Sequence, residues 1–397
     1  MAGISAHQSD KIVVVLAQLP RWADTFLWIA AGRAPKWLNW KTLWPATRSL
    51  PQHSPLAFFL AFVTAQDTGA YRVTRIQLIG GDGGFDYVTA DPDSRNLYVA
   101  RSGPGGHIGV FNLDTLAQVS DIPSTSAHGA AVDSATGHGF ATSSPVTMFD
   151  AKTFAVLKKI DVQGHPDGYL NDPYNHRFYI LSHAEPNITV LDDKDGSILG
   201  TINIGGTPEQ AATDGHGRIY VDIEDKAAIA GIDANAMKMI GKYDVSSKGG
   251  ECAGLALDTK NGILFAACRE HKNMVILSAA DGHIITDLPI GNGCDGAVFN
   301  PDTMEAFSSQ GDGTLTVIKE HSPSSFSVEQ TVPTPARAKT LTLDTKTGHI
   351  FSITAEYGPV PAAPAQPVSG TPPSNVPAWM RGPRPPMIPS SFQNPGD

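Results

Sequence analysis

One short pattern recurs seven times in this 397-residue chain, and it restricts the fold more than any other feature. Each copy has an apolar run, an Asp or Asn that opens a turn, and a second apolar run, as in DYVTADPDSRNLYVA from Asp86. Neighbouring copies are 39 to 44 residues apart. A period of about 40–45 residues with short strands is typical of a propeller blade, which buries its apolar faces by stacking on its neighbours. The turn-opening residues are Asp91, Asp133, Asp172, Asp214, Asp258, Asn300 and Asp344.

A second hairpin follows in each repeat and brings the strand count to four. In the second copy, VTMFD from Val146 is followed by a strand within Phe154–Val162, and turn residues join such runs throughout. We therefore predict an all-β fold, a seven-bladed β-propeller of four-stranded blades. The run Tyr71–Ile79 precedes the first repeat and resembles a fourth strand. We expect this N-terminal strand to join the last blade and close the ring, which removes an exposed sheet edge.

Three parts of the chain differ in composition. Residues 1–65 contain five of the six tryptophans and no repeat, residues 66–358 carry the propeller, and residues 359–397 include 12 prolines. Proline lacks a backbone donor, so the last part cannot form a helix or a central strand. Two alternatives remain for it: a long loop that leads to a final strand at Ser391–Gln393, or a tail.

The end of the first part resembles a secretory signal peptide. Arg48 precedes the apolar run Pro55–Val63, and small residues follow up to Ala65; this is the order of charged flank, apolar core and cleavage site. A stable bilayer span needs about 20 apolar residues, so we expect none here. We expect an exported protein, periplasmic or extracellular, whose translation starts downstream of Met1. The alternative is a membrane-associating N-terminal segment.

The charge balance disfavours nucleic acid as a partner. Without residues 1–65 the chain has 23 Lys and Arg against 37 Asp and Glu, a net charge of −14. Such an acidic surface repels phosphate backbones. Net charge far from zero also favours solubility. We expect a monomer.

The three cysteines allow one disulfide. Cys252 opens the first strand of the fifth repeat and Cys268 closes its second strand, so the two fall nearly opposite each other across the hairpin and could form a cross-strand bridge. Free thiols are the alternative. Cys294 would be unpaired, and the absence of a CxxC or Cys/His spacing argues against structural zinc.

Aligning the repeats on the turn residue places one polar ring at the channel entrance. The residue five positions upstream heads each innermost strand, and in the fifth repeat Glu251 stands two residues before the apolar Ala253. Crowded carboxylates perturb one another's pKa values and attract a cation. The ring consists of Asp86, His128, Asp167, Glu209, Ala253, Asp295 and Lys339.

Oxygen ligands with one imidazole suit Ca²⁺, Mg²⁺ or Mn²⁺, and no other cofactor is indicated. The candidate metal ligands are Asp86, His128, Asp167, Glu209 and Asp295. The alternative is a polar, water-filled channel without a ligand. Loops expected on the same face carry further polar side chains that could contribute to a site: Arg101, His107, His165, His183, Glu185, Lys226, Arg269, His271 and Asp312.

The repeat resembles the YVTN-type β-propeller repeat. The segments DPDSRNLYVA, DPYNHRFYIL and DTKNGILFAA, together with strands such as ITVLD, are similar to the periplasmic YncE-like family of seven-bladed propellers. The resemblance covers Tyr71 to Gly358 and implies an exported propeller more firmly than any reaction. The chain departs from this family in its N-terminal extension and in the abrupt end after Gln393.

Two functions are compatible with these features. The first is a binding module whose ligand, a protein, a cell-wall component or a small molecule, docks on the face that carries the ring. The second is a metal-assisted hydrolase of lactonase type, in which a cation held by the ring polarises a carbonyl or activates water. The sequence contains no GxSxG or HExxH motif, so other hydrolase classes are not indicated.

Overall fold

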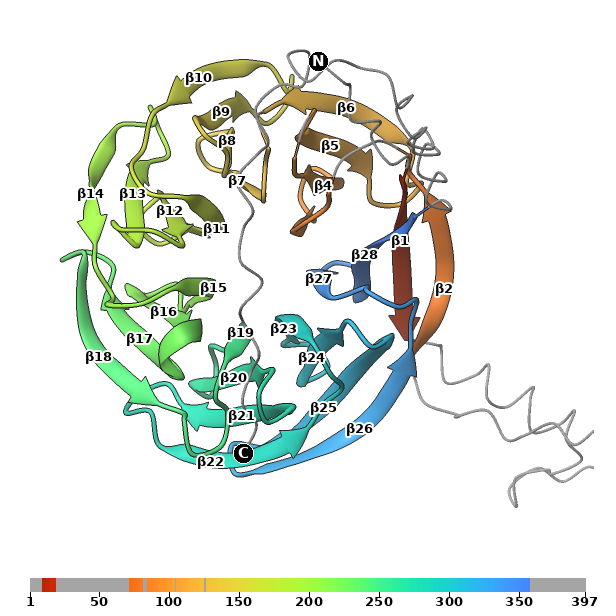
Figure 1. Cartoon of the computed structure of the whole chain (residues 1–397), viewed down its shortest axis with the longest axis vertical. Helices are drawn as coiled ribbons and strands as arrows, with labels where there is room; N and C mark the ends of the chain where they lie inside the picture. The colour runs from red at the N-terminus through yellow and green to blue at the C-terminus, as the bar shows by residue number, and fades with distance from the viewer. Residues whose placement is uncertain (1–8, 19–70, 81–83, 104, 125, 358–397) are drawn as a thin grey trace, which may run out of the picture. The chain divides into compact units, whose positions relative to one another are not determined.

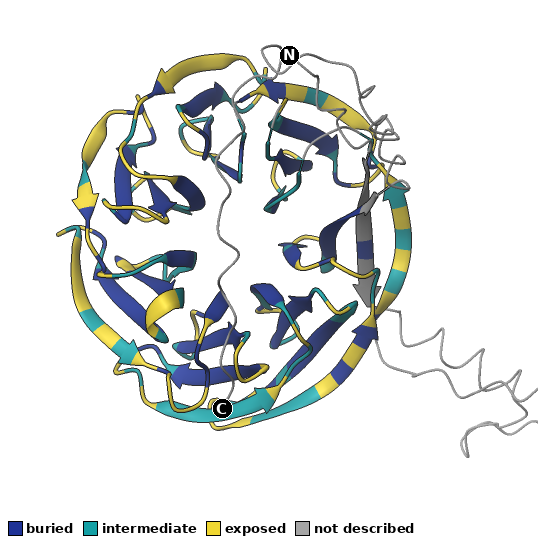
Figure 2. Ribbon diagram, in the orientation of Figure 1, coloured by how far each residue is buried: buried dark blue, intermediate teal, exposed yellow. Residues whose placement is uncertain are grey.

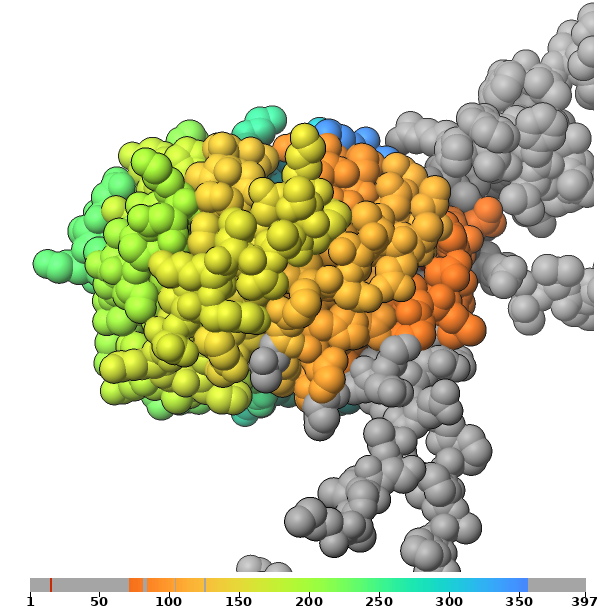
Figure 3. Space-filling view, turned by 90° about the horizontal axis from the view of Figure 1, so that it is seen from above, coloured from red at the N-terminus to blue at the C-terminus, as the bar shows by residue number. Residues whose placement is uncertain are grey.

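Seven four-stranded antiparallel sheets stand around a common axis in the computed structural model, which confirms the predicted propeller (Figure 1). The structure describes residues 9–18, 71–80, 84–103, 105–124 and 126–357. Blades one to four follow one another around the side of the molecule in chain order (Figure 3). In the described residues no helix has the length and apolar character needed to cross a membrane.

The strands of blades one to six run outward from the axis in sequence order. Blades one to three contain β3 (Val88–Asp91), β4 (Asn96–Arg101), β5 (His107–Asn112), β6 (Gln118–Pro123), β7 (Ala130–Asp133), β8 (His138–Ala141), β9 (Val146–Asp150), β10 (Val156–Ile160), β11 (Pro166–Asp172), β12 (Arg177–Ser182), β13 (Ile188–Asp192) and β14 (Ile198–Ile202). Blades four to six contain β15 (Pro208–Thr213), β16 (Arg218–Ile223), β17 (Ala228–Asp233), β18 (Lys238–Asp244), β19 (Cys252–Asp258), β20 (Ile263–Cys268), β21 (Asn273–Ser278), β22 (Ile284–Pro289), β23 (Cys294–Asn300), β24 (Glu305–Gln310), β25 (Thr314–Ser322) and β26 (Ser325–Pro333). A 3₁₀ turn, η2 (Glu224–Lys226), joins β16 to β17.

The repeated Asp or Asn has a local structural role in all seven blades. In each blade its side-chain Oδ1 accepts a hydrogen bond from the backbone N–H two residues later, at 2.7 to 3.3 Å. Asp and Asn favour this turn because their short side chains mimic a backbone acceptor. The most regular feature of the sequence is therefore the turn between the first and second strands.

Apolar side chains on the middle strands fill the spaces between blades. Leu181 and Val190 of blade three pack with Val221 and Ala230 of blade four in one fully buried cluster. Inner and middle strands are mostly buried, whereas the outermost strands are mostly exposed or partly exposed (Figure 2). Each blade thus depends on its neighbours for its core, as expected of a repeat fold.

Blade seven joins the two ends of the chain. Its order from the axis outward is β27 (Thr340–Asp344), β28 (His349–Tyr357), β1 (Ser9–Gln18) and β2 (Tyr71–Leu78). The predicted closure of the ring by an N-terminal strand at Tyr71 is confirmed. Tyr71 also fixes this strand to blade six: its hydroxyl donates to Glu305 at 2.5 Å, and its backbone N–H donates to Gln330 Oε1 at 2.9 Å.

The third strand of blade seven differs from the sequence-based expectation. The structure fills this position with β1, which pairs antiparallel with both β28 and β2. The expected boundary at residue 65 is corrected, because β1 lies within the predicted extension. Its β-branched IVVV run suits a strand that has a neighbour on each side. The alternative at Ser391–Gln393, like the whole proline-rich segment and the signal-like segment, lies outside the described residues.

Candidate functional site

The polar ring is positioned by bulges at the start of the inner strands. The pairing of the first and second strands shifts register around Asp167, Glu209 and Asp295. A bulge re-aims side chains and is common beside functional sites. Asp86 and His128 stand two residues before their inner strands, and Lys339 and the neighbouring Glu251 stand one residue before theirs.

Glycines next to ring residues let the inner strands approach closely. A Cβ on Gly129 would lie 2.0 Å from the ring of Tyr169, and a Cβ on Gly168 would lie 2.5 Å from the carbonyl oxygen of Glu209. Neither distance is compatible with a side chain. Glycine after His128 and after Asp167 therefore allows the close contacts with Tyr169 and with the backbone of Glu209.

Five side chains from the first four blades form a continuous chain of contacts, which we name the mouth arc. His128 Nδ1 lies 2.8 Å from Asp86 Oδ2 and 2.8 Å from Asp167 Oδ1. His183 Nε2 lies 3.2 Å from Asp167 Oδ2 and 3.1 Å from Glu209 Oε2. Imidazoles and carboxylates thus alternate, and Asp167 stands at the centre with one oxygen toward each histidine.

The mouth arc shifts the proton affinities of its members. Hydrogen bonds to Asp167 and Asp86 raise the pKa of His128 to about 10. Burial raises the pKa of Asp86 to about 6. Burial alone would also raise the pKa of Asp167, but the hydrogen bond from His128 and its positive charge lower it. The hydrogen bond to Glu209 raises the pKa of His183. Without another cation, protons on the imidazoles balance these carboxylates.

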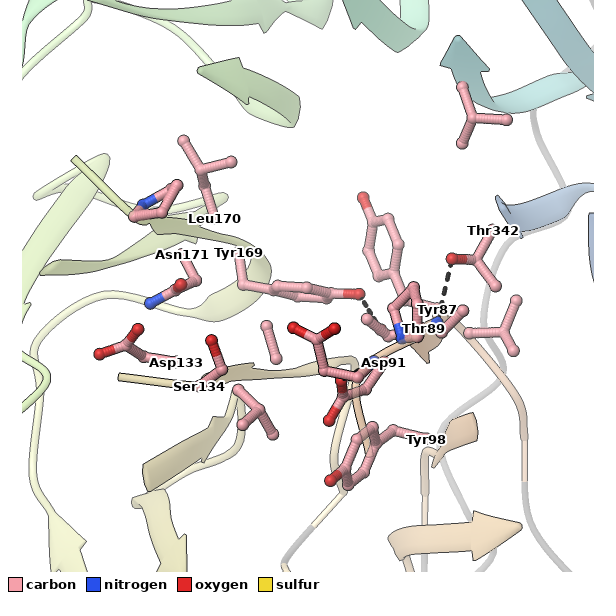
Figure 4. A pocket seen from close by; sticks show the side chains of 18 of the residues that line it. Tyr87, Thr89, Asp91, Tyr98, Asp133, Ser134, Tyr169, Leu170, Asn171 and Thr342 are labelled. Atoms are coloured by element: carbon pink, nitrogen blue, oxygen red, sulfur yellow. Dashed lines mark hydrogen bonds between the residues drawn. The ribbon is translucent and has the colours of Figure 1, made fainter. Parts of the chain in front are cut away.

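Side chains that cross the channel lie next to the mouth arc. The Tyr87 hydroxyl of blade one donates to Glu209 of blade four, 3.2 Å to the carbonyl oxygen and 3.4 Å to Oε1. Burial raises the pKa of Tyr87 well above its usual value, so this group acts as a neutral donor. Tyr169 reaches across to the Thr89 hydroxyl (Figure 4). The Gln210 side chain bonds the backbone of Leu255 and Ala297.

A cavity of about 440 Å³ is lined by the inner strands farther along the channel. Its wall includes Tyr87 and Thr89 from blade one and Tyr169, Leu170 and Asn171 from blade three (Figure 4). The side chains drawn there combine aromatic, aliphatic and polar groups. None of the members of the mouth arc lines this cavity, so the two features are distinct.

A second group of charges, the arginine cluster, gathers on blades four to seven around Arg269. The guanidinium binds Glu224, Asp295 and Glu251, the last at 3.0 Å. Lys339 binds the other oxygen of Asp295. Asp295 therefore has two cationic partners. In the described residues it is not part of any cluster of side chains whose donor atoms converge closely enough to hold a metal ion. This changes its expected role from metal ligand to ion-pair acceptor.

Three members of these sites were not in the aligned ring: His183, Arg269 and Glu224. Glu224 lies in η2 and was not among the candidate residues of the sequence. His183 and Arg269 follow the second strands β12 and β20, and the sequence identified them only as residues of loops on this face. Other residues of that set make local contacts: Asp312 accepts from the backbone of Asn292 at 2.6 Å, and His107 lies 3.2 Å from Asp121. The repeat alignment cannot select among loop residues, because loops differ in length between blades.

The cysteines are arranged as the spacing allows. Cys252 and Cys268 face each other across β19 and β20 and form a disulfide. Cys294 is a buried free thiol, and burial raises its pKa to about 12. A protonated, buried thiol is a poor nucleophile and metal ligand.

The mouth arc offers two groups of metal donors. Asp86, His128 and Asp167 form one, and Asp167, His183 and Glu209 form the other, with all donor atoms of each group within 4.8 Å of one another. Two carboxylates and an imidazole are a donor set for borderline divalent ions. The residues present therefore fit a divalent cation.

Comparisons with known proteins identify the fold. No protein-family model matches the sequence, and no protein of curated function matches it. Among solved structures, the chain is similar to one in "Kuenenia stuttgartiensis Hydrazine Synthase", with 13% identity, a TM-score of 0.58, and 69% of this chain and 96% of that chain covered. It is also similar to one in "Crystal Structure of Mitotic Checkpoint Complex", with 14% identity, a TM-score of 0.57, and 69% of this chain and 90% of that chain covered. The RRP9 WD40 repeats are similar as well, with 9% identity, a TM-score of 0.57, and 70% of this chain and 96% of that chain covered. At these identities the likeness shows the fold alone: the chain is a β-propeller similar to WD40 propellers.

Proposed function

We propose that this protein is a propeller binding module that captures its ligand at the channel mouth through a divalent cation held by the mouth arc. The observation that carries the proposal is the position of Asp167. Its carboxylate is nearly buried and lies within 3.2 Å of two imidazole nitrogens that come from different loops. Such convergence of O and N donors is expensive for a purely structural contact, because each charge loses hydration.

The donor set favours Mn²⁺ or Zn²⁺ over Ca²⁺ and Mg²⁺. Hard cations prefer oxygen ligands throughout, whereas imidazole suits transition metals. Each group in the mouth arc includes one imidazole, either His128 or His183. We therefore expect Mn²⁺ to bind more tightly than Ca²⁺.

Export is part of this proposal. The Cys252–Cys268 disulfide supports an oxidising compartment, because such bonds are rare in cytosolic proteins of mesophiles. The resemblance to YVTN-type propellers supports the same location. Fractionation of cells that express the native gene tests it: recovery in the periplasm or medium is expected, and recovery only in the cytosol contradicts it.

Replacement of Asp167 tests the cation site. Asp167→Asn keeps the shape of the side chain but removes the charge shared by both donor groups, so we expect at least a tenfold loss of Mn²⁺ affinity by calorimetric titration. Glu251→Gln is the matched control, because Glu251 lies at the same face but in the arginine cluster. Equal Mn²⁺ affinity in wild type and Asp167→Asn contradicts the proposal.

Metal-assisted hydrolysis is a second candidate. Each donor group supplies three protein ligands, and catalytic metal sites commonly keep a position open for water or substrate. Hydrolysis of lactones or phosphoesters that depends on Mn²⁺ and is lost in Asp167→Asn would support it. Mn²⁺ binding without turnover of either class would leave the binding module as the function.

A further inference from the structure

We infer that the mouth arc holds a pair of divalent cations bridged by Asp167, and that the pair binds a phosphate-type oxyanion. This inference rests on the proposed cation site and adds a second ion and a ligand class. It follows from the two carboxylate oxygens of Asp167, each of which faces a different imidazole.

Asp167 faces two separate donor groups. Its Oδ1 lies 2.8 Å from His128 Nδ1, and its Oδ2 lies 3.2 Å from His183 Nε2. Asp86 completes the first group and Glu209 the second. A carboxylate that presents one oxygen to each of two metal sites is a bridging ligand, and bridged pairs of cations in proteins lie about 3.5–4 Å apart.

The donor spacing matches a coordination polyhedron. The four imidazole–carboxylate distances in the mouth arc lie between 2.8 and 3.2 Å. Ligands bound at about 2.0–2.2 Å to one ion and at right angles to each other are separated by about 3 Å. The same atoms can therefore occupy adjacent positions around an ion without large movements of the side chains.

The central and distal ligands are held in place. Asp167 and Glu209 have residue exposures of only 7% and 9%. Thr142 Oγ1 donates to the Asp167 carbonyl at 2.6 Å, and the Tyr87 hydroxyl contacts Glu209 Oε1 at 3.4 Å. Outer contacts of this kind orient metal ligands and raise affinity. They leave Glu209 Oε2 directed at His183.

The charge of the filled site calls for an anion. Three carboxylates, Asp86, Asp167 and Glu209, balance three of the four charges of two divalent cations. Three protein donors per cation also leave coordination positions unfilled. A tetrahedral oxyanion can supply oxygens to both ions and neutralise the excess charge. A phosphate group, free or as part of a monoester, meets both requirements.

The stoichiometry of Mn²⁺ binding tests the pair. The full chain, freed of metal with a chelator, is titrated with Mn²⁺ by calorimetry and by electron paramagnetic resonance. We expect two ions per chain and an exchange-coupled spectrum. His128→Gln and His183→Gln should each retain one ion with an uncoupled spectrum, Asp167→Asn should lose the coupling, and Glu251→Gln should match the wild type. Circular dichroism confirms that each variant is folded.

The possible outcomes separate this inference from the proposed function. If the wild type binds one ion per chain, and His128→Gln and His183→Gln each abolish its binding, the pair is overturned but a single cation site remains. No ion overturns both. Inorganic phosphate is the ligand probe: we expect its affinity to rise at least tenfold when Mn²⁺ is present. Phosphate affinity that is the same with and without Mn²⁺, or that persists in Asp167→Asn, overturns the oxyanion site.

Discussion

Asp193 shows how a single buried carboxyl can set the pH dependence of stability. It has no exposed surface, accepts from Asn171 Nδ2 at 2.5 Å, and its Oδ1 has no hydrogen-bond partner in the described residues. Burial and nearby acidic side chains, Asp133 first among them, raise its pKa to about 7. The protonated form is therefore the one that the folded protein prefers.

The sign of this effect gives a prediction for Asp193→Asn. The raised pKa means that the folded state binds the Asp193 proton more tightly than the unfolded state does. The stability that this proton contributes is therefore full below the unfolded pKa of 3.8 and is lost as pH rises to about 7. The expected loss is on the order of 3–4 kcal/mol. The variant does not titrate here, so it should gain stability relative to wild type between pH 4 and 7. Urea unfolding at several pH values measures this; a difference that is constant over that range contradicts it.

Residue positions in the ring were predictable where the repeat defines them. Asp86, His128, Asp167 and Glu209 are equivalent positions in successive blades, and the sevenfold symmetry brings equivalent positions together. His183 and Arg269 were not predictable to the same degree, because their side chains come from loops whose course depends on tertiary contacts. The pairing of Asp295 with two cations depends on those loops as well.

At the scale of elements, the first turn of each blade is the unit that the sequence specifies best. Asp214 in blade four accepts hydrogen bonds from the N–H groups of His216 at 2.7 Å and Arg218 at 2.9 Å. Asn300 makes the equivalent contact with Asp302 in blade six. An amide therefore serves as well as a carboxylate in this turn.

This equivalence predicts different effects for two substitutions of Asp214. Asp214→Ala removes the acceptor and should cost about 1 kcal/mol of stability, whereas Asp214→Asn should be nearly neutral. Chemical denaturation of both variants is the measurement. Equal destabilisation by the two would mean that the charge, not the turn, is what stabilises this element.

The strands were predictable and one of their pairings was not. Alternating apolar runs and turn residues indicate where β3 to β28 lie, because these signals are local. The insertion of β1 between β28 and β2 is a pairing between segments more than 50 and more than 300 residues apart. Local patterns do not specify such a pairing, so the sequence offered Ser391–Gln393 only as one alternative for the third strand of blade seven and did not indicate β1.

At the scale of the whole molecule, the seam in blade seven determines how the ring closes. Without β1, the facing edges of β28 and β2 would have no strand between them, and exposed edges promote association with other chains. A chain that begins at Gln66 is therefore expected to melt at a lower temperature than the full chain and to form oligomers. Differential scanning calorimetry and light scattering measure both. Equal melting temperatures with a monomeric product would show that β1 is dispensable.

The arrangement of the mouth also belongs to this scale. Four blades supply the mouth arc, and the remaining blades contribute most of the arginine cluster, so the entrance has two electrostatically different halves. Such a division is typical of a surface that orients a charged ligand. It follows from the closed ring, because no single blade contains more than a part of either group.

Anomalous diffraction at the manganese edge, from crystals of the full chain grown with Mn²⁺, tests the cation site most directly. We expect anomalous density within about 2.2 Å of Asp167 and of at least one imidazole of the mouth arc. Manganese found only elsewhere on the molecule, with His128 and His183 still in contact with their carboxylates, would contradict it.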